Sequence, residues 1–413
     1  MNLKIRKILV LTDFFFPDSP GGANKMAYYS SKGLRENGSS VVVITRKAKP
    51  DLLDRQKLSG MNICRYEWNF QNPVQSLWRA RNKIRFYLNA QYREDLKPFD
   101  LVIVHQPLTV RLIGSHPATK GSPWLYNFHS PWGEEFMIKA SHNGNANIRG
   151  KIRAALVPKL LDHIEGNTLQ RCRKIVVLSK FMCSKLEHLH GHTSKIEIIP
   201  GGVDTETFRP ATDRKRVGEE LGLPDDKIIL LTVRNLRPRM GLSNLITAIS
   251  LCGQLRSKLH LIIAGSGKLS EKLKNQTDKM GLSDEIIFPG RISEEHLVKY
   301  YQAADVFILP TRRLEGFGLA TLESLACGLP VIGTPVGATP EILSQFGKEW
   351  LSEDSSAKSL AQKISGRVQW IIAHPQKNHL LRQHLQATVA QNYGWPNIIS
   401  QWDSVCDAIC QSG

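Results

Sequence analysis

The segment from residue 315 to residue 337 combines two glutamates with a glycine-rich turn. Glu315 opens it, a Gly-Phe-Gly turn follows, and Glu323 comes eight residues after Glu315 on a helix expected to begin near Leu319. The start of a helix offers unpaired backbone N–H groups and a partial positive charge, which suit a phosphate. Carboxylates beside a phosphate suit sugar hydroxyls. The spacing alone leaves open that both glutamates are ordinary surface acids.

Rigid elements must position such a segment, and short apolar runs alternate with longer amphipathic stretches along the chain. The runs are β-branched and nearly continuous, which is typical of strands buried on both faces of a sheet. Strands are predicted at 7–14, 41–45, 101–105, 124–129, 174–179, 195–200, 228–233, 259–265, 285–290, 305–310 and 330–334, and helices at 23–37, 242–255, 268–280, 293–303 and 319–327. The alternation predicts an α/β protein with parallel sheets.

The length of 413 residues predicts two domains, because one hydrophobic core rarely serves so long a chain. The hinge is predicted in the Gly-, Pro- and charge-rich stretch 200–216. No apolar run approaches the roughly 20 residues of a membrane span, and the start of the chain is interpreted as a strand, not a signal peptide. Seven scattered cysteines argue against a disulfide framework and favour the cytosol.

The net charge of +18 is unevenly distributed along the chain. Residues 1–200 carry 31 Lys and Arg against 15 Asp and Glu, a balance of +16, whereas residues 201–413 carry 24 against 22, a balance of +2. Such a division indicates that the first half meets a polyanion or an anionic membrane surface.

The chain resembles the retaining GT-B glycosyltransferases of family four, the group 1 enzymes that use nucleotide-sugar donors. The most specific match is EGFGLATLESLACGLPVIGT, with its two glutamates. Supporting matches are IPGGVD at 199–204, AGSG at 264–267, FPGRIS at 288–293 and YYQAADVFILPT at 300–311. The resemblance implies two Rossmann-like domains facing each other across a cleft. An acceptor domain would span 1–205, with 394–413 crossing back to it, and a donor domain would span 206–393.

By this resemblance, Glu323 would hold the ribose hydroxyls and Glu315 the hydroxyls of the donor sugar. The remaining donor-binding residues implied are Gly21, Gly22, Gly265, Arg291, Ile292, Gly316, Phe317, Gly318 and Leu319. The loop around Arg291 and Ile292 would read the base largely through its backbone.

Arg234 lies where the family has an arginine that binds the donor diphosphate, and a guanidinium suits this role because its fork matches phosphate oxygens. The alternative for Arg234 is a surface salt bridge. The family usually has a lysine where this chain has Met240. The neighbouring Arg239 is therefore predicted to supply the missing charge, and its alternative is an exposed loop arginine.

His129 ends a predicted strand of the first domain and matches the histidine that the family sets against the donor sugar. A structural histidine is the alternative. The reaction implied is retaining hexosyl transfer from a UDP- or GDP-linked sugar, with the leaving phosphate helping to deprotonate the acceptor. No cofactor is expected, and the absence of an Asp-x-Asp motif predicts no metal requirement. A saccharide or a lipid-linked acceptor would fit.

The stretch 76–97 is aromatic and basic, with Trp78, Ile84, Tyr87 and Leu88 expected along one side of a helix. A basic amphipathic helix is typical of a membrane-surface element, and an ordinary domain helix is the alternative. A second basic patch comprises Arg149, Lys151 and Arg153. Together they predict a cytoplasmic protein bound peripherally at the inner face of the plasma membrane.

Two other classes remain as alternatives. The pI of about 9.6 is compatible with a protein that binds nucleic acid or another polyanion. However, the chain contains no recognised nucleic-acid motif, and no nucleic-acid partner is expected. A GT-B epimerase or phosphorylase would need a second nucleotide-sugar site or a cofactor lysine, and the sequence indicates neither.

Overall fold

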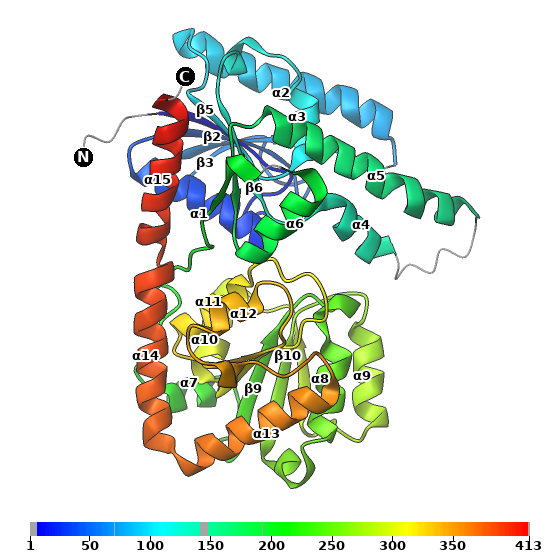
Figure 1. Cartoon of the computed structure of the whole chain (residues 1–413), viewed down its shortest axis with the longest axis vertical. Coiled ribbons are helices and arrows are strands. Elements are labelled where there is room, and N and C mark those ends of the chain that lie inside the picture. Colours follow the sequence, from blue (N-terminus) through cyan, green and yellow to red (C-terminus); the bar gives the residue numbers. More distant parts are fainter. Residues whose placement is uncertain (1–5, 70, 141–147, 192, 412–413) are drawn as a thin grey trace. The chain divides into compact units, whose positions relative to one another are not determined.

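The computed structural model describes residues 6–69, 71–140, 148–191 and 193–411 (Figure 1). The chain divides into two compact units, of which the first comprises Met1–Gly201 with Trp395–Gly413 and the second comprises Gly202–Gly394. The boundaries expected from the sequence, at 205/206 and 393/394, are a few residues away from these. Each unit is an α/β unit built on one sheet.

The first unit is built on an eight-stranded sheet with the order β3-β4-β2-β1-β5-β6-β7-β8. The strands are β1 (Lys7–Leu11), β2 (Ser40–Arg46), β3 (Arg55–Leu58), β4 (Met61–Tyr66), β5 (Leu101–Val104), β6 (Trp124–Phe128), β7 (Lys174–Val177) and β8 (Ile196–Ile198). Six correspond to predicted strands, but β3 and β4 were not expected, and β3 runs antiparallel to β4. The prediction of purely parallel sheets is therefore wrong at this edge, where β3 is too polar and exposed to show an apolar run.

The helices of the first unit are α1 (Gly22–Glu36), α2 (Pro73–Asp95), α3 (Pro107–Ile113), α4 (Trp132–Ala140), α5 (Ile148–Arg171), α6 (Lys180–His190) and α15 (Trp395–Gln411). Helix α15 packs closely on α1, because a Cβ on Gly33 would lie 2.3 Å from Ile399. Its Trp402 is fully buried in the core of this unit, and its Asp403 pairs with Arg6. The predicted return of the C-terminal helix to the first domain is confirmed.

The side of α2 that faces the core differs from the predicted one. Ile84, Tyr87 and Leu88 are buried, whereas Trp78 is 66% exposed. The four residues therefore do not form one membrane-facing side, because three of them pack into the core of the first unit. The second basic patch, residues 149–153, lies outside the described side chains. Within the described residues, no helix is both long and apolar enough to cross a bilayer.

The second unit has a five-stranded parallel sheet with the order β11-β10-β9-β12-β13. The strands are β9 (Ile228–Val233), β10 (Leu259–Ala264), β11 (Ile286–Gly290), β12 (Val306–Leu309) and β13 (Val331–Gly333). The helices are α7 (Arg214–Glu220), α8 (Leu242–Ser250), α9 (Ser270–Lys279), α10 (Glu294–Ala303), α11 (Leu319–Ala326), α12 (Thr339–Leu343), α13 (Ala357–Ala373) and α14 (Pro375–Tyr393). All five strands match predicted ones.

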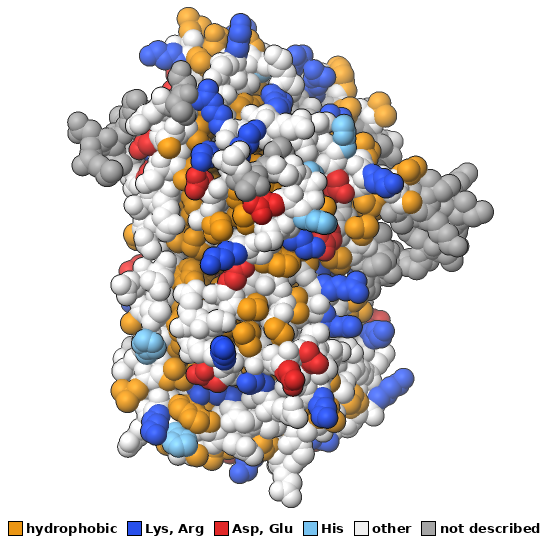
Figure 2. Space-filling view, in the orientation of Figure 1, with side chains coloured by type: hydrophobic (Ala, Val, Ile, Leu, Met, Phe, Trp, Pro, Cys, Tyr) orange, Lys and Arg blue, Asp and Glu red, His pale blue; other side chains and the backbone are white. Residues whose placement is uncertain are grey.

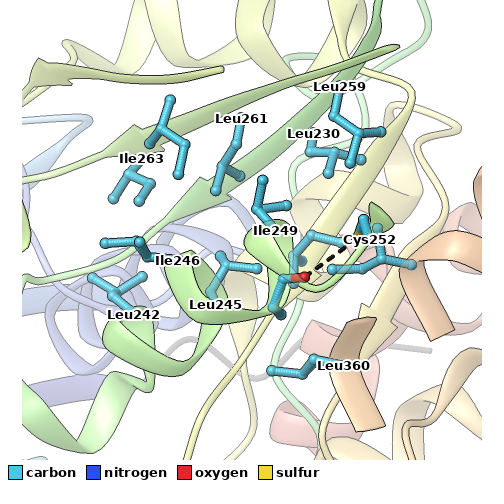
Figure 3. Close-up of a cluster of buried hydrophobic side chains, with 14 of the residues drawn as sticks. Leu230, Leu242, Leu245, Ile246, Ile249, Cys252, Leu259, Leu261, Ile263 and Leu360 are labelled. Carbon is cyan, nitrogen blue, oxygen red and sulfur yellow. Dashed lines mark hydrogen bonds between the residues drawn. The ribbon is translucent and has the colours of Figure 1, made fainter. Parts of the chain in front are cut away.

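The core of the second unit lies between its sheet and helices α8 and α13 (Figure 3). Ile246 and Ile249 of α8 pack in the same fully buried cluster as Leu261 of β10, and Leu360 comes from α13. Burial of such side chains stabilises the unit by about 1.5–3 kcal/mol each. The result is a rigid sheet whose loops at the carboxyl ends of the strands are held in place.

Candidate active site

The loops after β9, β10 and β12 approach one another more closely than side chains would allow. A Cβ on Gly241 would lie 1.7 Å from the Pro310 carbonyl oxygen, and a Cβ on Gly265 would lie 1.9 Å from the Arg234 carbonyl oxygen. Both glycines have positive φ angles, of 73° and 137°. The loops therefore need glycine at both positions to form one continuous surface at the carboxyl edge of the sheet, where ligands of open α/β sheets bind.

Arg234 and Glu315 form a buried ion pair on this surface. Their side chains are only 8% and 10% exposed. Through Nη2, Arg234 donates to the Glu315 carboxylate, to Thr311 Oγ1 at 3.0 Å and to the Met240 sulfur at 3.0 Å, and Thr311 in turn donates to Glu315 at 2.9 Å. The Arg234 Nε is buried and has no partner among the described residues. The guanidinium is thus held in place through Nη2, while its Nε and Nη1 groups donate no hydrogen bond to a described residue.

Glu323 lies on α11, which begins at Leu319 as predicted. The Tyr301 hydroxyl of α10 donates to Glu323 Oε2 at 3.1 Å, and both side chains are buried. Gly318 precedes the helix with φ 89° and ψ 62° in the left-handed region, so the chain turns sharply before the first helical amides. The first turn of α11 carries no acidic residue. The negative group near the positive end of this helix is the Glu315 carboxylate, whose Oε1 would lie 3.7 Å from a Cβ on Gly318.

The glycine turn between the two glutamates is half-buried at Gly316 and Gly318 and buried at Phe317. The Phe317 ring lies 6.3 Å from the ring of Tyr393, which anchors the turn to α14. The predicted backbone contacts with a donor at Gly316 to Leu319 therefore fall on a fixed turn, and they remain a prediction.

Arg239 is directed at the protein backbone. Its Nη1 donates to the Leu314 carbonyl oxygen at 2.5 Å and lies 3.5 Å from the Arg313 carbonyl oxygen. Met240 is buried, with its sulfur against Arg234. Arg239 thus fastens the loop that carries Glu315 in this structure, and its predicted role on a diphosphate remains a prediction.

The base-reading loop predicted at Arg291 and Ile292 follows β11. The Gly265 amide donates to the Gly290 carbonyl oxygen at 2.7 Å, which places this loop beside the one after β10. Arg291 is exposed and Ile292 is half-buried. The structure therefore brings together, at one sheet edge, the loops that carry Arg234, Gly265, Gly290 and Glu315.

His129 lies in the first unit, just after β6, and pairs with His105 at the end of β5. The two rings are stacked, with His105 Nδ1 3.1 Å from His129 Nε2 and the Trp402 ring 6.5 Å behind His105. Burial lowers the pKa of His129 to about 4, and burial together with the nearby His129 lowers that of His105 well below its ordinary value. Both imidazoles are therefore neutral near pH 7.

Three polar atoms beside this pair are buried without a partner among the described residues: His129 Nδ1, His105 Nε2 and Asn127 Oδ1. Buried polar atoms are normally hydrogen-bonded, so a group of such exceptions indicates a ligand or a water molecule. His105 was not predicted as a site residue, although the same strand-end position that singles out His129 also applies to it.

Asp13, after β1, is a second residue that the sequence did not single out. Burial raises its pKa to about 6, against the opposing effects of Arg46 and of a 3.1 Å hydrogen bond from Thr109. Its backbone amide donates to Gln106 Oε1 at 2.7 Å. The only signal for Asp13 in the sequence is that an acidic residue interrupts the apolar run of the first predicted strand.

Gly21 and Gly22 lie at the start of α1, with Gly21 as the residue before the helix at φ 137°. Both are exposed, and the Asn24 side chain donates to the carbonyl oxygens of Ser19 and Pro20 at 3.2 Å each. These bonds hold the glycine turn against the first helical turn. The contact of Gly21 and Gly22 with a donor remains a prediction.

Comparisons with known proteins agree with this fold. The family model described as Glycosyl transferases group 1 matches residues 213–369, and the model described as Glycosyltransferase Family 4 matches residues 20–207. The fold and these two matches define a GT-B glycosyltransferase. The chain belongs to the family-four, or group 1, glycosyltransferases.

Two relatives and one solved structure illustrate the similarity. The D-inositol 3-phosphate glycosyltransferase of Acidothermus cellulolyticus is 28% identical over 77% of this chain and 71% of its own length. The phosphatidylinositol N-acetylglucosaminyltransferase gpi3 subunit of Schizosaccharomyces pombe is 23% identical over 97% and 80%. A sucrose-phosphate synthase from Thermosynechococcus elongatus, 21% identical, superposes with a TM-score of 0.78 over 99% of this chain and 100% of that one, and shows the fold alone.

Proposed function

We propose that the chain transfers a hexosyl group from a UDP- or GDP-linked sugar to a saccharide or lipid-linked acceptor, with retention at the anomeric carbon and without a metal ion. The observation that carries this proposal is the buried Arg234–Glu315 pair beside the start of α11. One surface of loops therefore presents a cation, a helix N-terminus and a carboxylate. The cation and the helix N-terminus suit a diphosphate, and the carboxylate suits the sugar joined to it.

In this proposal Arg234 and the first amides of α11 bind the leaving diphosphate. Negative charge grows on that group as the glycosidic bond breaks, so a fixed guanidinium and helix dipole stabilise the transition state more than the bound donor. Glu315 accepts hydrogen bonds from the sugar and Glu323 from the ribose. The leaving phosphate takes the proton of the acceptor hydroxyl on the same face of the sugar, which gives retention.

His129 contributes an uncharged imidazole to the sugar, since its pKa of about 4 leaves it neutral at physiological pH. A neutral ring accepts or donates one hydrogen bond without placing a positive charge beside an oxocarbenium-like centre. This supports a positioning role on a sugar hydroxyl, not that of a general acid.

We also propose that the first unit binds the cytoplasmic face of an anionic membrane through α2. Val74, Leu77, Trp78 and Phe86 are 47–81% exposed on this helix, and its Arg residues at 79, 81 and 85 are also exposed. Figure 2 shows Lys and Arg side chains interspersed with hydrophobic ones on the end of the first unit that carries α2. Exposed aromatic and basic side chains together suit the interface of an anionic bilayer.

The donor is tested by thermal unfolding with UDP-glucose, GDP-mannose and ADP-glucose. A ligand that binds only the folded state raises its stability, by about 2.7 kcal/mol at a hundred times its dissociation constant. One of these donors should raise the midpoint of the wild type but not that of Glu323→Ala. Glu295→Ala, an exposed acid at the start of α10, is the matched control. Failure of every nucleotide sugar to stabilise the wild type would refute the proposed donor class.

A further inference from the structure

A basic cavity of about 540 Å³ lies in the first unit, apart from the strand ends that carry the two histidines. Five cations line it, Lys47, Lys49, Arg65, Arg79 and Lys83, against two acids, Asp54 and Glu67. The lining charge is therefore five minus two, or +3, and becomes +2 once Asp18, which pairs with Arg65, is included. Its volume is within the range of about 300–1,000 Å³ that is usual for small-molecule pockets.

The cavity is built at the carboxyl ends of β2 and β4, with α2 as its wall. The strands are parallel, and the Lys47 amide that follows β2 donates to the Tyr66 carbonyl oxygen at the end of β4 at 2.8 Å. The Tyr87 hydroxyl of α2 donates to the Arg65 carbonyl oxygen at 2.8 Å. The carboxyl edge of a parallel sheet is where ligands bind in this class of fold.

Arg65 forms the floor and is fully engaged within the protein. It is 1% exposed, and its guanidinium donates to Asp18 at 2.6 and 3.0 Å, to the Leu53 carbonyl oxygen at 3.0 Å and to Gln56 at 3.1 Å. It is therefore a structural residue that shapes the cavity and is not offered to a ligand.

The remaining cations exceed the acids that could neutralise them. Asp54 is shared by Lys47 at 2.7 Å and Lys83 at 2.5 Å, and Lys47 also lies 3.4 Å from Glu67. These pairs orient the two ammonium groups on the cavity wall. Lys49 and Arg79 are exposed and form no ion pair with a described residue. Uncompensated cations around a concave surface favour an anion.

We propose that this cavity binds a phosphate group carried by the acceptor. This inference rests on the proposed function and narrows its acceptor to a phosphorylated one. Lys47 and Lys83 supply ammonium donors, and Arg79 supplies a guanidinium that can bind phosphate oxygens through two N–H groups. This phosphate belongs either to a phospholipid headgroup or to a soluble phosphomonoester. The exposed Trp78 on the helix that contributes Arg79 and Lys83 suits a lipid source.

The test measures binding of sn-glycerol 3-phosphate by calorimetry to the wild type and to Lys49→Gln combined with Arg79→Gln. Both side chains are exposed, so the variant should fold normally. Affinity should fall about tenfold or more, because charged hydrogen bonds are lost. Lys274→Gln combined with Lys279→Gln on α9, also exposed, is the matched control and should bind as the wild type does. Equal affinity of the cavity variant, or no binding by the wild type, would overturn the inference.

A second measurement separates this inference from the proposed function and identifies the source of the phosphate. The cavity variant should still be stabilised by the nucleotide sugar that stabilises the wild type. A failure of phosphate binding alone therefore refutes the phosphate site and leaves the proposed sugar transfer intact. Vesicles of phosphatidylglycerol, but not of phosphatidylcholine, should displace sn-glycerol 3-phosphate if a lipid headgroup enters the cavity. Displacement by neither vesicle assigns the cavity to a soluble phosphorylated acceptor.

Discussion

His105 Nδ1 lies 3.1 Å from His129 Nε2, so these two neutral rings share one proton between them. The Asn127 side-chain amide lies 3.4 Å from the same His105 Nδ1. If the amide nitrogen of Asn127 donates there, His105 Nδ1 is an acceptor and His129 must donate through Nε2. The buried Nδ1 of His129 is then an unprotonated acceptor, which the proposed function assigns to a sugar hydroxyl.

This relationship predicts that His105 positions His129. His105→Phe should lower kcat about fivefold, the effect of one lost neutral hydrogen bond of about 1 kcal/mol. His105→Asn places an amide oxygen near the Nδ1 position and should recover most of the rate. Steady-state kinetics of both variants make the comparison, with thermal unfolding to show that both are folded. Equal loss in the two variants would mean that the ring of His105 matters only for packing against Trp402.

The depressed pKa of His129 predicts a loss of stability in acid. Its folded pKa of about 4 is below the ordinary 6.5, so between these values the unfolded chain binds more protons and stability falls as pH falls from 6.5. The loss approaches 1.4 kcal/mol per pH unit. Urea unfolding at pH 7.5, 6.5 and 5.5 should show a steeper fall in the wild type than in His129→Phe.

The wild type must be compared with His129→Phe because Asp13 has the opposite effect on the pH dependence of the unfolding free energy. Its pKa is raised to about 6 from 3.8, so its contribution to stability is present at low pH and is lost as pH rises through 6. Asp13 is unchanged in His129→Phe and cancels from the difference. A difference in unfolding free energy that stays constant from pH 7.5 to 5.5 would contradict the depressed pKa.

The glutamates of the second unit should be essential for transfer. Glu315→Ala and Glu323→Ala should each lower kcat/KM about ten- to a hundredfold, since a charged hydrogen bond is worth about 1.5–3 kcal/mol. Glu315→Ala should also destabilise the unit, because it leaves the buried Arg234 guanidinium without its carboxylate. Glu315→Gln keeps the shape and separates the two effects. Near wild-type turnover in both alanine variants would remove the main support for the proposed function.

The substitution Arg239→Ala distinguishes a role on the diphosphate from a role in fastening the loop at Leu314. Arg239→Ala should lower turnover more than it weakens donor binding, if the guanidinium reaches the diphosphate in the transition state. If instead Arg239 only fastens the loop at Leu314, thermal stability and donor affinity should fall together with turnover. Parallel kinetics, donor titration and thermal unfolding distinguish these outcomes.

Met240→Lys introduces the lysine expected at this position from the family resemblance and should recover part of the activity of Arg239→Ala. The buried Met240 sulfur is 3.0 Å from Arg234, so a lysine there would place its ammonium beside the guanidinium. Without a donor this should destabilise the protein, and a bound diphosphate should reverse the effect. A nucleotide diphosphate should therefore raise the unfolding midpoint of Met240→Lys more than that of the wild type.

Membrane binding through α2 is tested by vesicle flotation. The wild type should bind vesicles that contain phosphatidylglycerol and not neutral ones, with weaker binding in high salt. Arg81→Glu combined with Arg85→Glu should abolish flotation, and Trp78→Ala should weaken it. Lys274→Glu combined with Lys279→Glu removes the same charge from α9 and should have little effect. Binding to oligonucleotides but not to anionic vesicles would favour the nucleic-acid alternative.

The sequence by itself determined the α/β class, eleven of the strands and the start of α11 at Leu319. Continuous β-branched runs and a Gly-Phe-Gly turn are local signals, and each depends on residues near one another in the chain. The family resemblance likewise followed from one compact motif around Glu315 and Glu323.

Only the tertiary structure decided how distant side chains combine. The pairing of Arg234 with Glu315, the stacking of His105 on His129 and the burial of three α2 residues join positions far apart in sequence. Strand β3 also depends on the tertiary structure, because its polar residues form a strand only through antiparallel backbone pairing with β4. Burial and hydrogen bonding are set by neighbours across the fold, which periodicity along one chain cannot specify.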